Sequence, residues 1–232
     1  MAAPPYSLTL HTWCFPVAGC VGYRGYFDEA DARAEAARLA RSDGLETAVY
    51  GVPAYSTLGW MNWAGGDPLL NTFIGYPEGD FVRLMFHELA HQVVYAEGDT
   101  EFNESFATAV ERLGSALWLA EQATPQVREA FARSQQRRAV FRALVRATRL
   151  ALEAVYADAP ADATPELRQA KEAVYARFRA RYAELRAQWA ADMPPAALAA
   201  YDEWIAGANN ASFGAQAAYD VLVPAFEALF DQ

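Results

Sequence analysis

Basic residues are scarce in this chain of 232 residues. Lysine and arginine together number 19, with Lys171 as the single lysine, against 29 aspartates and glutamates, so the net charge is −10. A surface with this balance repels the phosphates of nucleic acids and of anionic lipids. We therefore expect no nucleic-acid partner.

Long apolar runs are also absent. No stretch of about 18 apolar residues occurs, so the sequence predicts no transmembrane helix. The first ten residues, MAAPPYSLTL, contain neither a basic segment nor a long apolar segment, which predicts no signal peptide. Taken as complete, a chain with these features is expected in the cytoplasm.

Cysteine occurs only twice, at Cys14 and Cys20. Their spacing differs from the Cys-x-x-Cys form of zinc sites, so a zinc pair is not predicted. Two alternatives remain open. The thiols can form a disulfide across a short turn, which suits an oxidising compartment, or they can be two small buried side chains.

Hydrophobic residues are plentiful, at 53% of the chain, which is enough for one sizeable core. We predict an α+β fold, mainly α, in a single domain over residues 1–232. Residues 1–79 are expected to form a small sheet lobe with one helix, at 28–41, and residues 80–232 a helical lobe. Strands within 6–27 and 45–56 are expected to form one sheet beside the helix that carries His87.

Helical periodicity and capping residues predict the rest of the chain. Asp80 is expected to cap a helix ending near Gly98, and Thr100 a second helix to about Glu121. Thr-Pro pairs open two long helices, at about 125–158 and 165–191, whose apolar stripes indicate an antiparallel pair. A last helix is expected from about 212 to 230, broken near Pro224.

The sequence FHELAHQ at 86–92 is the strongest chemical signal. His87 and His91 are four residues apart, so both imidazoles project from one helix face and can reach one ion at about 2.0–2.1 Å. Glu88 lies about 100° further round the helix, where it can take a proton from a metal-bound water. The alternative is a buried pair of structural histidines.

A catalytic zinc site needs a third protein ligand, and four glutamates follow on the chain: Glu97, Glu101, Glu104 and Glu111. If the second helix returns antiparallel, a residue level with His91 lies about four to eight places beyond residue 100. Glu104 fits that position. Glu111 overshoots it by a turn and suits the acceptor of a histidine N–H.

Several segments resemble one bacterial family, described as predicted zinc aminopeptidases of the gluzincin group. They are HELAHQ with NESFATAVE, TWCFPVAGCVGYRGYFDEADA, AYSTLGW, NNA and YDVLVPAFE. The resemblance implies that Zn²⁺ is bound by His87, His91 and Glu104, with Glu88 as general base and a peptide as substrate. It also implies a periplasmic or cell-envelope location.

Several residues are candidates for the donor that stabilises the oxyanion. Tyr219 is the predicted catalytic partner of Glu88, because it lies in a family-like segment. Asn209 and Asn210 lie in another such segment, and His11 and Tyr55 are further candidates. His11 is more readily explained as a strand-packing residue.

The sequence thus predicts a zinc-dependent peptidase and leaves aminopeptidase and endopeptidase activity as alternatives. For an aminopeptidase, Glu101 is a candidate for the acid that holds the substrate amine, and its alternative is an acid of the capping turn. Two alternatives stand beside the peptidase. One is a helical interaction protein with a structural metal or none, and the other is a zinc hydrolase of non-peptide amides. Three converging ligands favour catalysis, because structural zinc sites have four.

Overall fold

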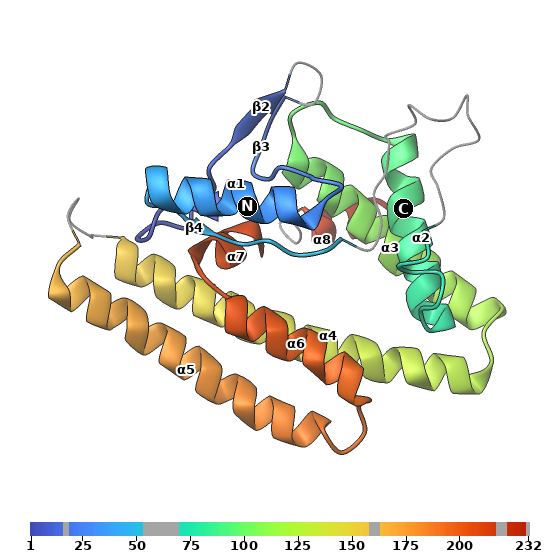
Figure 1. Cartoon of the computed structure of the whole chain (residues 1–232). Coiled ribbons are helices and arrows are strands. Elements are labelled where there is room, and N and C mark those ends of the chain that lie inside the picture. The colour runs from blue at the N-terminus through green and yellow to red at the C-terminus, as the bar shows by residue number, and fades with distance from the viewer. Residues whose placement is uncertain (16–18, 53–69, 158–162, 217–221, 231–232) are drawn as a thin grey trace. The chain divides into compact units, whose positions relative to one another are not determined.

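The computed structural model describes residues 1–15, 19–52, 70–157, 163–216 and 222–230. It is mainly helical, with 68% helix and 5% strand (Figure 1), which confirms the predicted class. None of the helices in these ranges is both long and apolar enough to span a membrane.

The chain folds into two compact units, and each takes residues from both sides of position 79. Unit 1 consists of Met1–Trp13, Gly22–Val49 and Ala139–Gln216, and unit 2 of Cys14–Val21, Tyr50–Arg138 and Ala217–Gln232. The division falls within the long helix α4 (Pro125–Tyr156).

Unit 1 is built on amphipathic helices whose ends follow the capping rules. Its described helices are α1 (Glu29–Ser42), α5 (Pro165–Trp189), α6 (Pro195–Gly207), α7 (Asn210–Ala215) and the part of α4 from residue 139. Asp28 caps α1 by accepting a hydrogen bond from the N–H of Ala30, and Gly44 follows with φ of 65°. Thr164 caps α5 through the N–H of Leu167, with Pro165 in the first turn.

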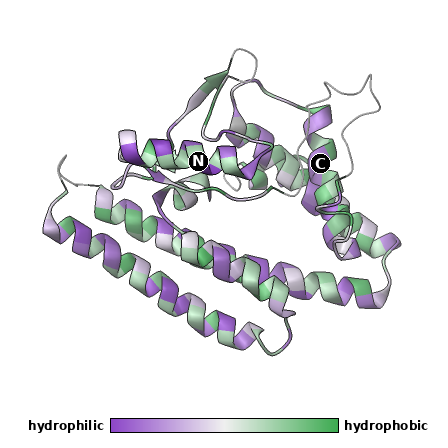
Figure 2. Cartoon of the chain, viewed as in Figure 1, coloured by the Kyte–Doolittle hydropathy of each residue, from purple (hydrophilic) through white to green (hydrophobic). Residues whose placement is uncertain are grey.

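The apolar stripes of α4 and α5 form the core of unit 1, as predicted. The two helices run antiparallel (Figure 1), and hydrophilic and hydrophobic residues alternate along both (Figure 2). The buried cluster consists of Val145, Leu152, Val174, Tyr175, Phe178, Tyr182, Trp189, Leu198, Ile205 and Phe213. Burial of this apolar surface is what holds the long helices together.

Among the described residues, the strands are shorter than predicted and form two separate pairs. In unit 1, β1 (Ala2–Ala3) pairs antiparallel with β4 (Glu46–Thr47). The other pair joins β2 (Trp13–Phe15) to β3 (Gly19–Val21). The prediction of one sheet from 6–27 and 45–56 is therefore wrong among the described residues. The prolines at 4 and 5 lack an N–H for a strand ladder and follow β1 directly.

A disulfide joins Cys14 and Cys20 across the β2–β3 hairpin, with an S–S distance of 1.97 Å. Both residues are exposed, so the alternative of two buried thiols is wrong. Gly19 enters the hairpin with φ of 70°, a conformation that favours glycine.

Unit 2 contains α2 (Glu78–Val93), α3 (Thr100–Glu121), the first part of α4 and α8 (Val223–Phe230). Asp80 does not cap α2, because the helix begins two residues earlier with Pro77 at the N-cap. Asp80 is instead buried against Arg138, at 2.7 Å. Helix α3 begins where predicted, but its cap is Asp99, which accepts a hydrogen bond from the N–H of Phe102.

The end of the chain holds more helices than the sequence predicted. Helix α6 was not predicted. The helix expected at 212–230, broken near Pro224, is present as two separate helices. Helix α7 ends at Ala215 and α8 begins at Val223, one residue before Pro224, where proline is tolerated because first-turn N–H groups lack partners.

Candidate metal centre

Helices α2 and α3 form an antiparallel hairpin that brings the HELAHQ and NESFATAVE segments together. Close approach depends on Gly114, since a Cβ there would lie 2.7 Å from the ring of Phe86. Glycine is unfavourable inside a helix. A glycine is found at position 114 because the ring of Phe86, the residue before His87, packs directly against it.

Asn103 fixes the turn between the two helices. Its buried side chain accepts a hydrogen bond from the N–H of Ala96 at 2.7 Å and donates one to the carbonyl of Ala96 at 2.8 Å. Gly98 lies in the same turn with φ of 76°. Because Glu104 is the next residue after Asn103, this pair of bonds sets where Glu104 begins its approach to α2.

Three side chains meet at the seam between α2 and α3. His87 Nε2 and His91 Nε2 are 3.3 Å apart. Glu104 Oε2 lies 3.3 Å from His87 Nε2, and Glu104 Oε1 lies 3.9 Å from His91 Nε2. The ligand atoms of these residues all lie within 4.8 Å of one another. Their side chains are 10 to 17% exposed, so the group is largely shielded but reachable.

These separations fit one tetrahedral ion. Two ligand atoms bound at about 2.0–2.1 Å on a tetrahedral zinc are about 3.3–3.4 Å apart. The separation of the two Nε2 atoms and the separation of His87 Nε2 from Glu104 Oε2 match this value, and the 3.9 Å separation from His91 Nε2 belongs to the other carboxylate oxygen, Oε1. Two imidazole nitrogens and one carboxylate are also a donor set that zinc prefers. The residues present therefore fit a zinc ion.

Glu111 lies behind His87, as the acceptor predicted for a histidine N–H. Its Oε2 is 3.0 Å from His87 Nδ1, and its Oε1 is 2.7 Å from Arg83 Nη1. A proton on Nδ1 that is donated to Glu111 leaves Nε2 free to bind a metal. Arg83 was not singled out by the sequence, although its position four residues before His87 puts it on the same helix face.

The charges around His87 favour a cation at this point. Burial by itself lowers the pKa of His87, but hydrogen bonds to Glu104 and Glu111 outweigh it and raise the pKa to about 9. Burial raises the pKa of Glu111, but the His87 hydrogen bond and the Arg83 charge hold it below its usual range. A proton and a metal compete for the same Nε2 atom.

The second histidine has the opposite tendency. Burial lowers the pKa of His91, and the neighbouring His87 lowers it further, against the attraction of Glu104. A neutral imidazole is the form that binds a metal. His91 is therefore prepared as a ligand.

The other acids of the motif region have different surroundings. Glu88 lies on α2 directly after His87 and is half-buried. Glu97 and Glu101 are exposed, and neither belongs to the group of three that could hold a metal. Glu104 is thus the acid that joins the two histidines.

Three of the candidate oxyanion donors lie in unit 1, where each has contacts of its own. Asn209 caps α7 in unit 1. Asn210 is fully buried there and accepts hydrogen bonds from the hydroxyls of Tyr156 and Tyr175. His11, also in unit 1, is exposed and packs edge-on against Trp13. These contacts explain all three as structural residues. Tyr219 and Tyr55 lie outside the described residues.

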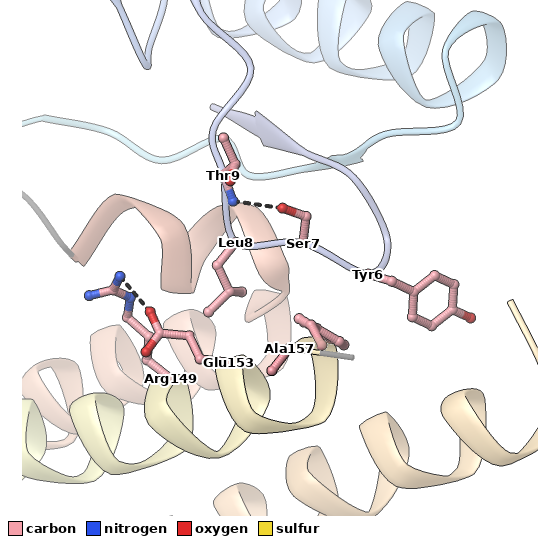
Figure 3. Close-up of a pocket in the computed structure, with 8 residues that line it drawn as sticks. Tyr6, Ser7, Leu8, Thr9, Arg149, Glu153 and Ala157 are labelled. Atoms are coloured by element: carbon pink, nitrogen blue, oxygen red, sulfur yellow. Dashed lines mark hydrogen bonds and ion pairs between the residues drawn. The ribbon is translucent and has the colours of Figure 1, made fainter. Parts of the chain in front are cut away.

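A cavity of about 380 Å³ in unit 1 is lined by side chains of a different kind from those of the α2–α3 seam (Figure 3). Arg149 and Glu153 pair within it at 2.7 Å, and the chain from Tyr6 to Thr9 forms part of its wall. No trio of metal-binding side chains lines this cavity. The α2–α3 seam is therefore the better candidate for the reactive site.

Comparison with known proteins identifies a family. A family model described as "Putative aminopeptidase" matches residues 1–232. No curated protein matches the chain, and no solved structure does.

Proposed function

The chain belongs to the Putative aminopeptidase family, and on that basis we propose that it is a zinc-dependent peptidase. In this proposal His87, His91 and Glu104 hold the zinc ion. The observation that carries it is the meeting of two Nε2 atoms and one carboxylate at separations of 3.3, 3.3 and 3.9 Å.

The number of available ligands supports a catalytic ion over a structural one. Structural zinc sites usually have four protein ligands and often include cysteine. Only three side chains gather here among the described residues, and both cysteines of the chain are joined in the disulfide. A three-residue set leaves one position for water or substrate, as hydrolysis needs.

A zinc ion held by His87, His91 and Glu104 would act as a Lewis acid and would lower the pKa of a bound water to about 7. The chain's own residues do the remaining work. Glu88 accepts the proton of the attacking water and passes it to the leaving amine. Glu111 accepts a hydrogen bond from His87 Nδ1–H, which leaves Nε2 available to bind a metal.

The description of the family supports aminopeptidase activity, which would require an acid that binds the free amine of the substrate. Glu101 was the sequence-based candidate, and it is exposed in the first turn of α3, where an acid favours the helix N-terminus. We therefore assign no role in amine binding to Glu101. For location, the exposed disulfide supports the cell envelope that the resemblance implied, because disulfides persist in oxidising compartments.

The test is a panel of fluorogenic substrates with free and acetylated N-termini, measured with chelator and after zinc is restored. An aminopeptidase cleaves only the free substrates, and restored zinc recovers the rate. In Glu88→Gln we expect unchanged zinc content and a kcat lower by about 10²–10⁴-fold. Glu97→Gln, an exposed acid outside the site, is the matched control. Full activity in Glu88→Gln would remove Glu88 from the mechanism.

A further inference from the structure

A row of charged side chains continues the metal site along the α2–α3 seam. Arg83 Nη1 donates to Glu111 Oε1 at 2.7 Å, and Glu111 Oε2 accepts from His87 Nδ1 at 3.0 Å. Each carboxylate oxygen therefore serves a different partner. Glu111 is held from both sides, by a cation on one and by a metal-ligand candidate on the other.

The helix register explains the row. Arg83 is one turn before His87 on α2, and Glu111 is about two turns after Glu104 on α3, so all four side chains face the same seam. The Arg83 and Glu111 side chains are 25% and 12% exposed. A carboxylate that is this well shielded depends on protein partners to hold its charge and its orientation.

We propose that Arg83 is a positioning residue of the metal centre and acts through Glu111 on His87. Arg83 orients the Glu111 carboxylate so that Oε2 accepts a hydrogen bond from His87 Nδ1–H, which leaves His87 Nε2 to bind the ion. The inference rests on the proposed function only in requiring that this site binds zinc. It does not depend on what the zinc enzyme hydrolyses.

Two effects of Arg83 have opposite signs, which makes the inference testable. If Arg83 acts by positioning Glu111, its removal weakens zinc binding. If its charge acts only through space, its removal tightens zinc binding, because the positive charge repels the ion. The effect of Arg83 on zinc binding also has to disappear when residue 111 can no longer accept the hydrogen bond from His87 Nδ1–H.

The experiment measures the dissociation constant of Zn²⁺ by competition with a chromophoric chelator. We expect Arg83→Met to weaken binding by about tenfold, as is typical of residues that orient metal ligands. Arg83→Lys should stay near the parent value, because a single N–H of Arg83 makes the contact with Glu111. In a Glu111→Met background, which removes the oxygen acceptor, Arg83→Met should cause no further weakening.

Arg138→Met is the matched control. Arg138 pairs with Asp80 of the same helix at 2.7 Å, and the two side chains are 27% and 10% exposed, but neither contacts a histidine in the described structure. Thermal unfolding of the metal-free proteins should show similar losses for Arg83→Met and Arg138→Met. Only Arg83→Met should change the zinc dissociation constant.

Several outcomes overturn the inference. They are unchanged or tighter zinc binding in Arg83→Met, equal weakening in Arg138→Met, and weakening by Arg83→Met that persists with Glu111→Met. Parent protein that binds no zinc overturns both this inference and the proposed function. Zinc binding without peptide hydrolysis would remove the proposed peptidase activity and leave the role of Arg83 standing.

Discussion

At the scale of single residues, Asn103 links the fold to the chemistry. It is 5% exposed and makes two hydrogen bonds to the backbone of Ala96, at 2.7 and 2.8 Å. An amide side chain is suited to this role because it both donates and accepts. The bonds hold the turn from which Glu104 rises to meet His87 and His91.

Asn103→Ala should therefore weaken both the turn and the site. Loss of two buried hydrogen bonds, with the Ala96 groups left unpaired, is expected to lower the free energy of unfolding by about 1–3 kcal/mol. Chemical denaturation checks the stability, and chelator competition checks the expected weaker zinc binding. Unchanged zinc affinity in a destabilised variant would show that the turn does not position Glu104.

Glu104→Gln tests the third ligand directly. A neutral amide binds zinc poorly. Loss of a residue that only orients a metal ligand lowers zinc affinity by about 10–100-fold, and we expect a larger loss for Glu104→Gln. Glu101→Gln, an exposed acid on the same first turns of α3, serves as control and should bind zinc as the parent does. Equal affinity in the two variants would exclude Glu104 from the ligand set.

The sequence was sufficient to predict that His87, His91 and Glu104 meet. Helix geometry fixes the spacing of the two histidines within α2 and limits which glutamate of α3 can be level with them. The sequence could not reveal Arg83 or Asn103. The partner of each is decided by the register of one helix against another, or by the path of a turn. Neither is encoded in the spacing of like residues along the chain.

At the scale of elements, the α2–α3 hairpin differs in detail from its prediction. Helix α2 ends at Val93 and not near Glu97. Glu104 still reaches the histidines, because residues 94–99 turn the chain and Asn103 holds that turn. The strands were predicted less well, since pairing partners far apart in sequence leave only a weak local pattern.

Gly114→Ala tests the close approach of the two helices. The new Cβ would meet the Phe86 ring at 2.7 Å, so we expect a loss of about 1–3 kcal/mol in unfolding free energy despite the better helix propensity of alanine. Gly207→Ala is the control, because a Cβ at the end of α6 meets nothing within 4 Å. Equal stability of the two variants would show that the seam tolerates a wider spacing.

At the scale of the whole molecule, zinc should stabilise one of the two units. The proposed ligands all lie in unit 2. A ligand at 100 times its dissociation constant stabilises the folded state by about 2.7 kcal/mol. Hydrogen exchange followed by mass spectrometry should therefore show zinc-dependent protection concentrated in α2 and α3.

Helix α5, in unit 1, provides the internal control for that experiment, because none of the proposed ligands lies there. Its amide protection should be the same with zinc and with chelator. Protection that rises equally in α5 and α2 would show that the ion acts elsewhere or that the two units unfold together.

The most direct test of the account is a crystal structure of the zinc-loaded protein with anomalous scattering measured at the zinc edge. We expect one strong anomalous peak at about 2.0–2.2 Å from His87 Nε2, His91 Nε2 and a carboxylate oxygen of Glu104. A peak bound by other residues, or no peak in protein that carries stoichiometric zinc in solution, would contradict it.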